Sequence, residues 1–350
     1  MCQKPALSTP AQRGLQQWMA VVPILFLEFL VIALPAGVLP IVINDHFGQR
    51  SYVLLGYSQA LRGFLAFLAS PALGALSDVI GRKYLFVACV VGSSMPYAIL
   101  GLGATLEMHI VALGVSGALT ATFPLCFAYI SDTVQPHARA SAFGIVLGVG
   151  MGGAYLLGPV IGTVIEAQYS AEMVFRCCLV LTLTNAAFAL FAMREAQRPP
   201  PPPTAELLRR SNPFASFALL RRNAAMRLLC AIVIFYYFAL WGFIANKGIY
   251  ARRRFDQTSR QTAEQLTLFG LVSALSQSVG LRAARRRFSE PQIARACFVC
   301  AVAAMLLYGC AQNVWMLYPP MALLGLSLGG FATISSLASQ VVPRPPASHG

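Results

Sequence analysis

Residues 52–76 and 84–102 are two apolar runs that are separated by a short charged turn containing glycine. Each run has about the 20 residues that an α-helix needs to cross a bilayer. Backbone groups have no water to bind inside a bilayer, so such runs must be helical. Similar windows are centred near residues 30, 64, 93, 119, 153, 183, 238, 272, 303 and 328. The sequence therefore predicts an all-α protein that crosses a membrane about ten times.

The composition supports a multi-pass membrane protein whose first partner is the lipid bilayer. Hydrophobic residues make up 57% of the chain and charged residues only 11%, against about 25% charged residues in a soluble domain. The net charge of +14 resides mainly in segments that share one side of the membrane with the N-terminus. This bias predicts a cytoplasmic N-terminus and central linker, although residues 252–254 violate it. It explains the charge better than nucleic-acid binding does.

The longest polar break, at residues 194–227, divides the predicted spans into groups of six and four. Its proline run at residues 199–203 cannot be helical and acts as a stiff spacer. We expect a cytoplasmic tail at 1–17, a six-helix bundle at 18–193, a basic proline-rich linker at 194–227, a partial bundle of about four helices at 228–342, and a tail at 343–350.

The turn between the two opening runs carries charges at the membrane surface, on Asp78, Arg82 and Lys83. Gly74 would let two helices approach closely, and Gly81 would allow a tight turn. We interpret this segment as a short helix-to-helix loop that acts as a hinge between moving helices.

The same turn resembles the signature loop of the major facilitator superfamily, G-x-L-[SA]-D-x-x-G-R-[KR], between the second and third helices. The specified positions are all matched, by Gly74, Leu76, Ser77, Asp78, Gly81, Arg82 and Lys83. Residues 26–29, 127–132 and 212–216 are similar to tetracycline-resistance-type drug:proton antiporters, and more closely to the hippocampus abundant transcript proteins. The resemblance implies the major facilitator fold, with two pseudo-symmetric six-helix halves of which the second is truncated. It also implies a conformational gate, in which the charges of the loop form a relay with Asp132.

The fifth predicted span is rich in glycine and resembles an antiporter signature that ends in G-P-x-x-G-G. Thr163 replaces its final glycine. Close packing by small residues explains the pattern equally well. The residues concerned are Gly144, Gly148, Gly158, Pro159 and Gly162.

Two charged residues lie inside predicted spans, Glu28 in the first and Arg62 in the second. Each is about ten residues from a membrane surface, which places it about 15 Å deep at a rise of 1.5 Å per residue. An unpaired charge at this depth is costly. We therefore expect the two to pair beside a central cavity, with Gln59 one turn away. Glu28 is either a proton carrier or half of a static structural pair.

We expect a secondary active transporter that moves a small organic solute by alternating access and is driven by protons. The alternatives are a non-transporting scaffold, a truncated remnant of a transporter, and a fragment of a twelve-span protein. An enzyme is not expected, because no nucleophilic triad or metal-spaced cluster occurs, and the four histidines are predicted in separate loops. The sequence predicts no cofactor and no metal.

Overall fold

The computed structural model describes residues 18–134, 142–195, 211–216, 224–330 and 333. The regular elements of these residues are helices, with no strands among them. Seven of the described helices are long and apolar enough to cross a membrane: Leu39–Ile80, Arg82–Gly101, Leu106–Thr133, Ala142–Gln168, Ala171–Ala192, Met226–Phe255 and Glu290–Gly309. Shorter apolar helices cover Val21–Ala36 and Val314–Ser327. Helices lie at or beside each predicted centre, which confirms the predicted fold class.

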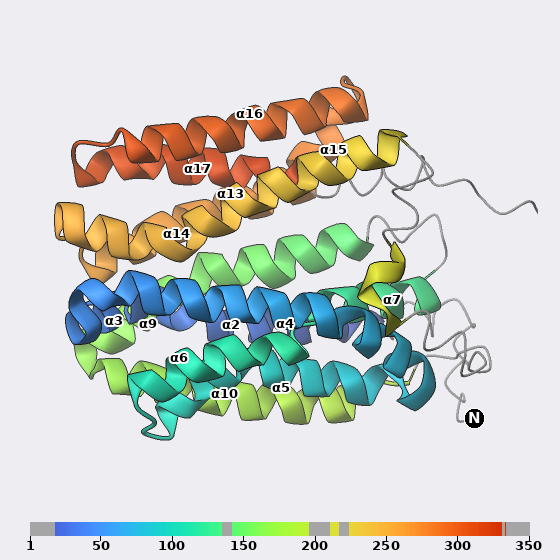
Figure 1. Cartoon of the computed structure of the whole chain (residues 1–350), viewed down its shortest axis with the longest axis horizontal. Coiled ribbons are helices and arrows are strands. Elements are labelled where there is room, and N and C mark those ends of the chain that lie inside the picture. The colour runs from blue at the N-terminus through green and yellow to red at the C-terminus, as the bar shows by residue number, and fades with distance from the viewer. Residues whose placement is uncertain (1–17, 135–141, 196–210, 217–223, 331–332, 334–350) are drawn as a thin grey trace, which may run out of the picture.

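The helices form two groups, which lie one above the other in Figure 1. The first helix group consists of α2 (Val21–Ala33), η1 (Leu34–Ala36), α3 (Leu39–Phe47), η2 (Gly48–Arg50), α4 (Ser51–Ile80), α5 (Arg82–Gly101), α6 (Leu106–Val115), η3 (Ser116–Leu119), α7 (Thr122–Thr133), η4 (Val146–Gly152), α9 (Gly153–Gln168) and α10 (Ala171–Ala192). The second helix group consists of α13 (Ala224–Phe255), α14 (Ser259–Leu275), η6 (Ser276–Gly280), α15 (Leu281–Ala284), α16 (Glu290–Gly309), η7 (Val314–Leu317) and α17 (Tyr318–Ser327). The 3-10 helix η5 (Pro213–Ser216) lies between them in the sequence.

The core of the first helix group is an apolar cluster that joins α2, α5 and α7. Ile24, Phe86 and Tyr129 in this cluster have no exposed surface. Burying such large side chains contributes roughly 25 cal/mol per Å² of apolar area. The cluster therefore fixes the positions of these three helices, which carry the polar residues considered below.

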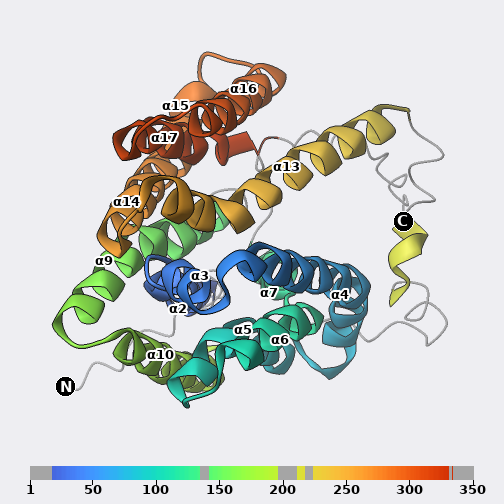
Figure 2. The same cartoon turned by 60° about the vertical axis from the view of Figure 1, so that its left-hand side comes forward.

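The bundle has two ends that differ in their contacts. At the end that we call the linker end, α4 passes into α5 and α10 ends before residues 196–210. At the opposite end, α3 passes into α4 and α13 passes into α14. In Figure 1, the ribbon of α13 rises away from the first helix group toward the linker end, where it is yellow. The groups also pack through α9 and α14, which lie side by side in Figure 2. Between these two helices, Thr267 Oγ1 donates to the carbonyl oxygen of Leu156 over 3.3 Å.

The structure corrects two expectations about the charged turn. Helix α4 continues to Ile80 and α5 begins at Arg82, so the predicted loop contracts to Gly81 alone. Asp78 consequently lies in the last turn of α4. Gly74 does not serve close helix packing, because a methyl group there would meet no described atom within 4 Å.

Candidate functional site

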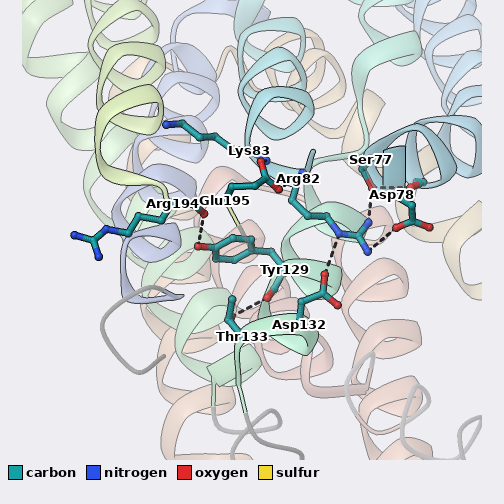
Figure 3. A network of polar contacts seen from close by, with 10 residues as sticks. Ser77, Asp78, Arg82, Lys83, Tyr129, Asp132, Thr133, Arg194 and Glu195 are labelled. Carbon is teal, nitrogen blue, oxygen red and sulfur yellow. Dashed lines mark hydrogen bonds and ion pairs between the residues drawn. The ribbon is translucent and has the colours of Figure 1, made fainter. Parts of the chain in front are cut away.

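Arg82 is the centre of a polar network at the linker end (Figure 3). Its Nη2 lies 2.8 Å from Asp78 Oδ1, one turn back along the chain, and its Nε lies 3.0 Å from Asp132 Oδ2 on α7. Its Nη1 donates a hydrogen bond to Ser77 Oγ. Side chains from α4 and α7 thus converge on one guanidinium, whose fixed fork of donors suits several acceptors at once. The structure brings together the three residues of the expected relay.

Gly81 makes this arrangement possible through its backbone. Its φ of 132° and ψ of 144° lie in a region that is open essentially only to glycine. This conformation turns the chain from α4 into α5 within one residue. As a result, the Arg82 side chain lies next to Asp78 and also faces Asp132 on α7.

Glu195, just beyond α10, contacts the same turn in a way that the sequence did not predict. Its Oε1 accepts from the backbone N–H of Arg82 over 2.7 Å, and its Oε2 accepts from that of Lys83 over 3.2 Å. These are otherwise unpaired donors at the N-terminus of α5, where the helix dipole favours a carboxylate. The neighbouring carbonyl of Arg194 accepts from Tyr129 Oη over 2.9 Å. The start of the predicted linker is thereby tied to the Arg82 network.

Lys83 contributes its backbone to this network, while its side chain points elsewhere. Its Nζ lies 5.9 Å from the centre of the Tyr84 ring. Of the two basic residues in the motif, Arg82 alone places its side chain between carboxylates.

Glu28 is a buried carboxyl in the middle of α2, with an exposed fraction of 3%. Its Oε1 accepts hydrogen bonds from Ser93 Oγ of α5 and, over 2.9 Å, from Thr122 Oγ1 of α7. Its Oε2 is buried and has no hydrogen-bond partner among the described residues. Three helices therefore meet at a carboxyl group with one satisfied oxygen and one unsatisfied oxygen.

The expected ion pair between Glu28 and Arg62 is not formed. Arg62 is half-buried on α4 and acts on Glu28 only through longer-range electrostatics. The hydroxyl groups of Ser93 and Thr122 take the place of the arginine, since they come from helices that pack directly on α2. Arg62 also interacts electrostatically with Tyr97 and Tyr155. Gln59 lies one turn earlier on α4 and is half-buried too.

The glycines of the fifth span differ in their surroundings. Gly158 and Gly162 face Ala33 and Leu34, where an added methyl group would collide with the backbone of η1 or its neighbours. Thr163, at the departure from the antiporter signature, donates its hydroxyl to the Pro159 carbonyl over 2.8 Å. Gly148 is buried within η4, whereas Gly144 faces no described atom within 4 Å. Close packing therefore accounts for Gly158 and Gly162 but not for Gly144.

Two histidines differ from the expectation that they lie in loops. His109 is buried in α6 and its Nδ1 lies 2.6 Å from the carbonyl oxygen of Pro96. His46 lies in α3, with its Nε2 3.1 Å from Glu107 Oε1. His137 and His349 fall outside the described residues. No group of three or more potential metal ligands occurs in the described part of the chain.

Comparison with known proteins identifies the family of this chain. The sequence matches the Major Facilitator Superfamily over residues 21–350. The chain belongs to the major facilitator superfamily. It is therefore a member of a family of membrane transporters and not of an enzyme family.

Individual relatives agree with this assignment. The chain is 26% identical to hippocampus abundant transcript-like protein 1 of Homo sapiens, over 91% of this chain and 63% of that protein. It is 30% identical to the class C tetracycline resistance protein of Escherichia coli, over 88% of this chain and 76% of that protein. The chain thus spans less than two thirds of the first relative's length. The solved structure of the human organic anion transporter MFSD10 superposes with a TM-score of 0.68 at 20% identity, over 95% of this chain and 86% of the other, and this shows the shared fold.

Proposed function

We propose that this protein is a secondary active transporter that moves a small organic solute by alternating access, coupled to protons at Glu28. The observation that carries the proposal is the buried carboxyl of Glu28, which has hydroxyl donors on one oxygen and, within the described part of the chain, no partner on the other. Membership of a transporter family supports the general activity. The coupling and the solute are our inference from the residues.

Glu28 suits a proton carrier because the described residues around it supply no compensating cation in direct contact. An ionised carboxyl that is buried without a paired charge is costly, and binding a proton removes that cost. Ser93 and Thr122 are held on α5 and α7. A movement of these helices relative to α2 would change the hydrogen bonds that Oε1 accepts. The affinity of the site for a proton would then alternate with the conformation of the bundle.

Arg62 suggests that the solute carries a negative charge. It lies within a predicted span and makes no ion pair with any described residue. A guanidinium inside a membrane protein is usually paired or faces a solute or ion path. An anionic group of the solute would supply a counter-ion. The structural neighbour MFSD10, which is described as an organic anion transporter, is consistent with this idea.

We assign the gate at the linker end to the Arg82 network, with Asp78, Asp132 and Glu195 as its acceptors. In this proposal the network holds α4, α5, α7 and the end of α10 as one unit that moves during the transport cycle. Gly81 supplies the sharp turn that this unit needs.

The test uses the purified full chain in liposomes with an imposed pH gradient. Two probes are offered. Fluorescein is an organic anion, and tetracycline is the drug in the name of one relative. We expect gradient-driven uptake of fluorescein, its loss in Glu28→Gln, and a reduced uptake in Arg62→Gln. Glu172→Gln is the matched control, because Glu172 is 81% exposed and its ion pair with Arg176 is a surface pair.

Uptake by Glu28→Gln at the wild-type rate under the gradient would overturn the coupling role. Preference for tetracycline over fluorescein, unchanged in Arg62→Gln, would overturn the anionic solute. A wild-type protein that exchanges neither probe, with or without the gradient, would count against transport itself.

A further inference from the structure

The run Arg252–Arg254 violates the charge bias that otherwise orients the chain, and the structure shows how one of its members is used. Arg253 stands at the end of α13, at the opposite end of the bundle, and reaches from the second helix group to the first. Its neighbours in the run contribute less, because Arg254 stays on its own helix and Arg252 reaches the first helix group only through a long ion pair. Arg254 lies 5.7 Å from the rings of Tyr250 and Phe255 on its own helix, and Arg252 has a long ion pair of 3.9 Å with Asp45.

The guanidinium of Arg253 is bound by the turn between α3 and α4. Its Nε donates to Asn44 Oδ1 over 2.9 Å, and its Nη1 donates to Gln49 Oε1 over 2.8 Å. Its Nη2 donates to Ser51 Oγ over 3.0 Å and to the carbonyl oxygen of Gly48. Four of the five donors of the side chain are thereby used.

A stacking contact completes this site. The centre of the guanidinium lies 4.2 Å from the centre of the Tyr52 ring at the start of α4. A planar guanidinium can stack on an aromatic ring while its edges donate, and an ammonium group cannot do both. The acceptors are neutral oxygens, so the contact selects the shape of arginine and not merely a positive charge.

The turn that supplies the acceptors is held in shape by Gly48 and Ser51. Gly48 has a φ of 53° and a ψ of −126°, a backbone conformation that side chains strongly disfavour. Ser51 Oγ donates to the Gly48 carbonyl over 2.8 Å while it accepts from Arg253. The turn thus presents a preformed set of oxygens toward α13.

Other contacts between the helix groups gather at the same end. Ser259 Oγ, at the start of α14, donates to Glu166 Oε1 on α9 over 3.1 Å. Gly248 on α13 lies against Pro40 of α3, where an added methyl group would be 3.1 Å from the proline ring. The opposite end is therefore closed by contacts on both flanks, and Arg253 makes the most hydrogen bonds among them.

We propose that Arg253 is the latch that holds the two helix groups together at the opposite end and keeps the solute path shut there. The inference rests on the proposed alternating-access function, since a latch has meaning only if this end opens. Arg253 is a positioning residue that binds the turn at Gly48, and it need not touch the solute. During the cycle the guanidinium leaves the turn, and water replaces its bonds to the oxygens that its departure exposes.

The test measures hydrogen–deuterium exchange of the full chain in lipid nanodiscs without any solute. In Arg253→Gln, we expect exchange at residues 39–55 and 250–262 to rise about tenfold, because one hydrogen bond to a charged group is worth about that factor in an equilibrium constant. Exchange at residues 76–86 should fall, because opening one end closes the other. Arg253→Lys should give an intermediate rise, and Arg254→Gln is the matched control and should leave both ends unchanged.

Unchanged exchange at the opposite end of Arg253→Gln would overturn the proposal. A rise at both ends would overturn it too. That pattern indicates that Arg253 stabilises the whole bundle and does not link the opening of one end to the closing of the other. No solute takes part in the measurement, so failure of the transport assay leaves this result intact. Conversely, a failed latch leaves the result for Glu28→Gln as it stands.

Discussion

Arg82 and Arg253 are arginines of similar geometry at the two ends of one bundle, and they connect different things. Arg82 binds Asp78 and Asp132, which both belong to the first helix group. Arg253 belongs to the second helix group and binds the turn at Gly48 in the first. One arginine therefore stabilises a single group, whereas the other joins the two groups.

The chemistry of the acceptors differs in the same sense. Arg82 lies between carboxylates whose side chains are 26% and 27% exposed. Arg253 has neutral oxygens and an aromatic ring as partners. Separating a guanidinium from two carboxylates is expensive, while neutral contacts are replaced by water more readily. The comparison suggests that the linker-end network stays intact as its helices move and that the contact at the opposite end breaks and reforms.

The largest effect is expected for Arg82→Ala, which leaves two carboxylates without their shared cation. We expect a loss of about 3 kcal/mol in the free energy of unfolding, from the charged hydrogen bonds removed. Thermal unfolding of the purified protein measures it. Lys83→Ala is the control, because the Lys83 side chain lies over the Tyr84 ring and forms no ion pair with a described carboxylate, and a similar loss in that variant would contradict the account.

Gly81→Ala should come next, with a loss of about 2 kcal/mol from backbone strain at a φ of 132°. The matched variant is Gly74→Ala, seven residues earlier in a helical and open position. That substitution should be neutral or slightly stabilising, because alanine is the better helix former. Equal melting temperatures for the two variants would show that the turn is not strained by a side chain.

Gly48→Ala tests the opposite end and should cost about 1 kcal/mol, since the turn is exposed and can relax. It also misplaces the carbonyl that accepts from Arg253. In a double-mutant cycle with Arg253→Gln, the two changes should be non-additive, because they remove the same contact. Strict additivity in thermal unfolding would separate the turn from the latch.

Glu195→Gln should have the smallest effect, about 0.5 kcal/mol, because the amide oxygen can still accept one hydrogen bond while the charge at the N-terminus of α5 is lost. Because this charge acts through the helix dipole, the loss should shrink at high salt. Melting curves at low and high ionic strength measure it, and an effect that does not depend on salt would argue against the dipole.

The fold and part of the site followed from the sequence because they depend on local patterns. Apolar runs fixed the helices, and the motif placed Asp78 and Arg82 together in the charged turn between two of them, although the helices leave only Gly81 as the break. The motif further implied Asp132, which the structure places beside Arg82.

Contacts between distant segments were not predictable in the same way. Ser93 and Thr122 are isolated hydroxyl residues in apolar helices, and nothing in their spacing links them to Glu28. Arg253 and its acceptors are more than 200 residues apart in the sequence. The charge of Arg253 was visible as a violation of the orientation rule, but its partner required the packing of both helix groups.

The central claim is that the two ends open alternately, and distances measured by electron paramagnetic resonance test it directly. Spin labels are placed in a variant whose nine cysteines are replaced by alanine. One pair uses the exposed residues Tyr84 and Phe288 at the linker end, and the other uses Leu102 and Trp315 at the opposite end. When the pH is lowered from neutral to acidic, we predict that the opposite-end distance lengthens while the linker-end distance shortens. We predict the same two changes in Arg253→Gln. Distances that lengthen together, or that do not change in either condition, would contradict the account.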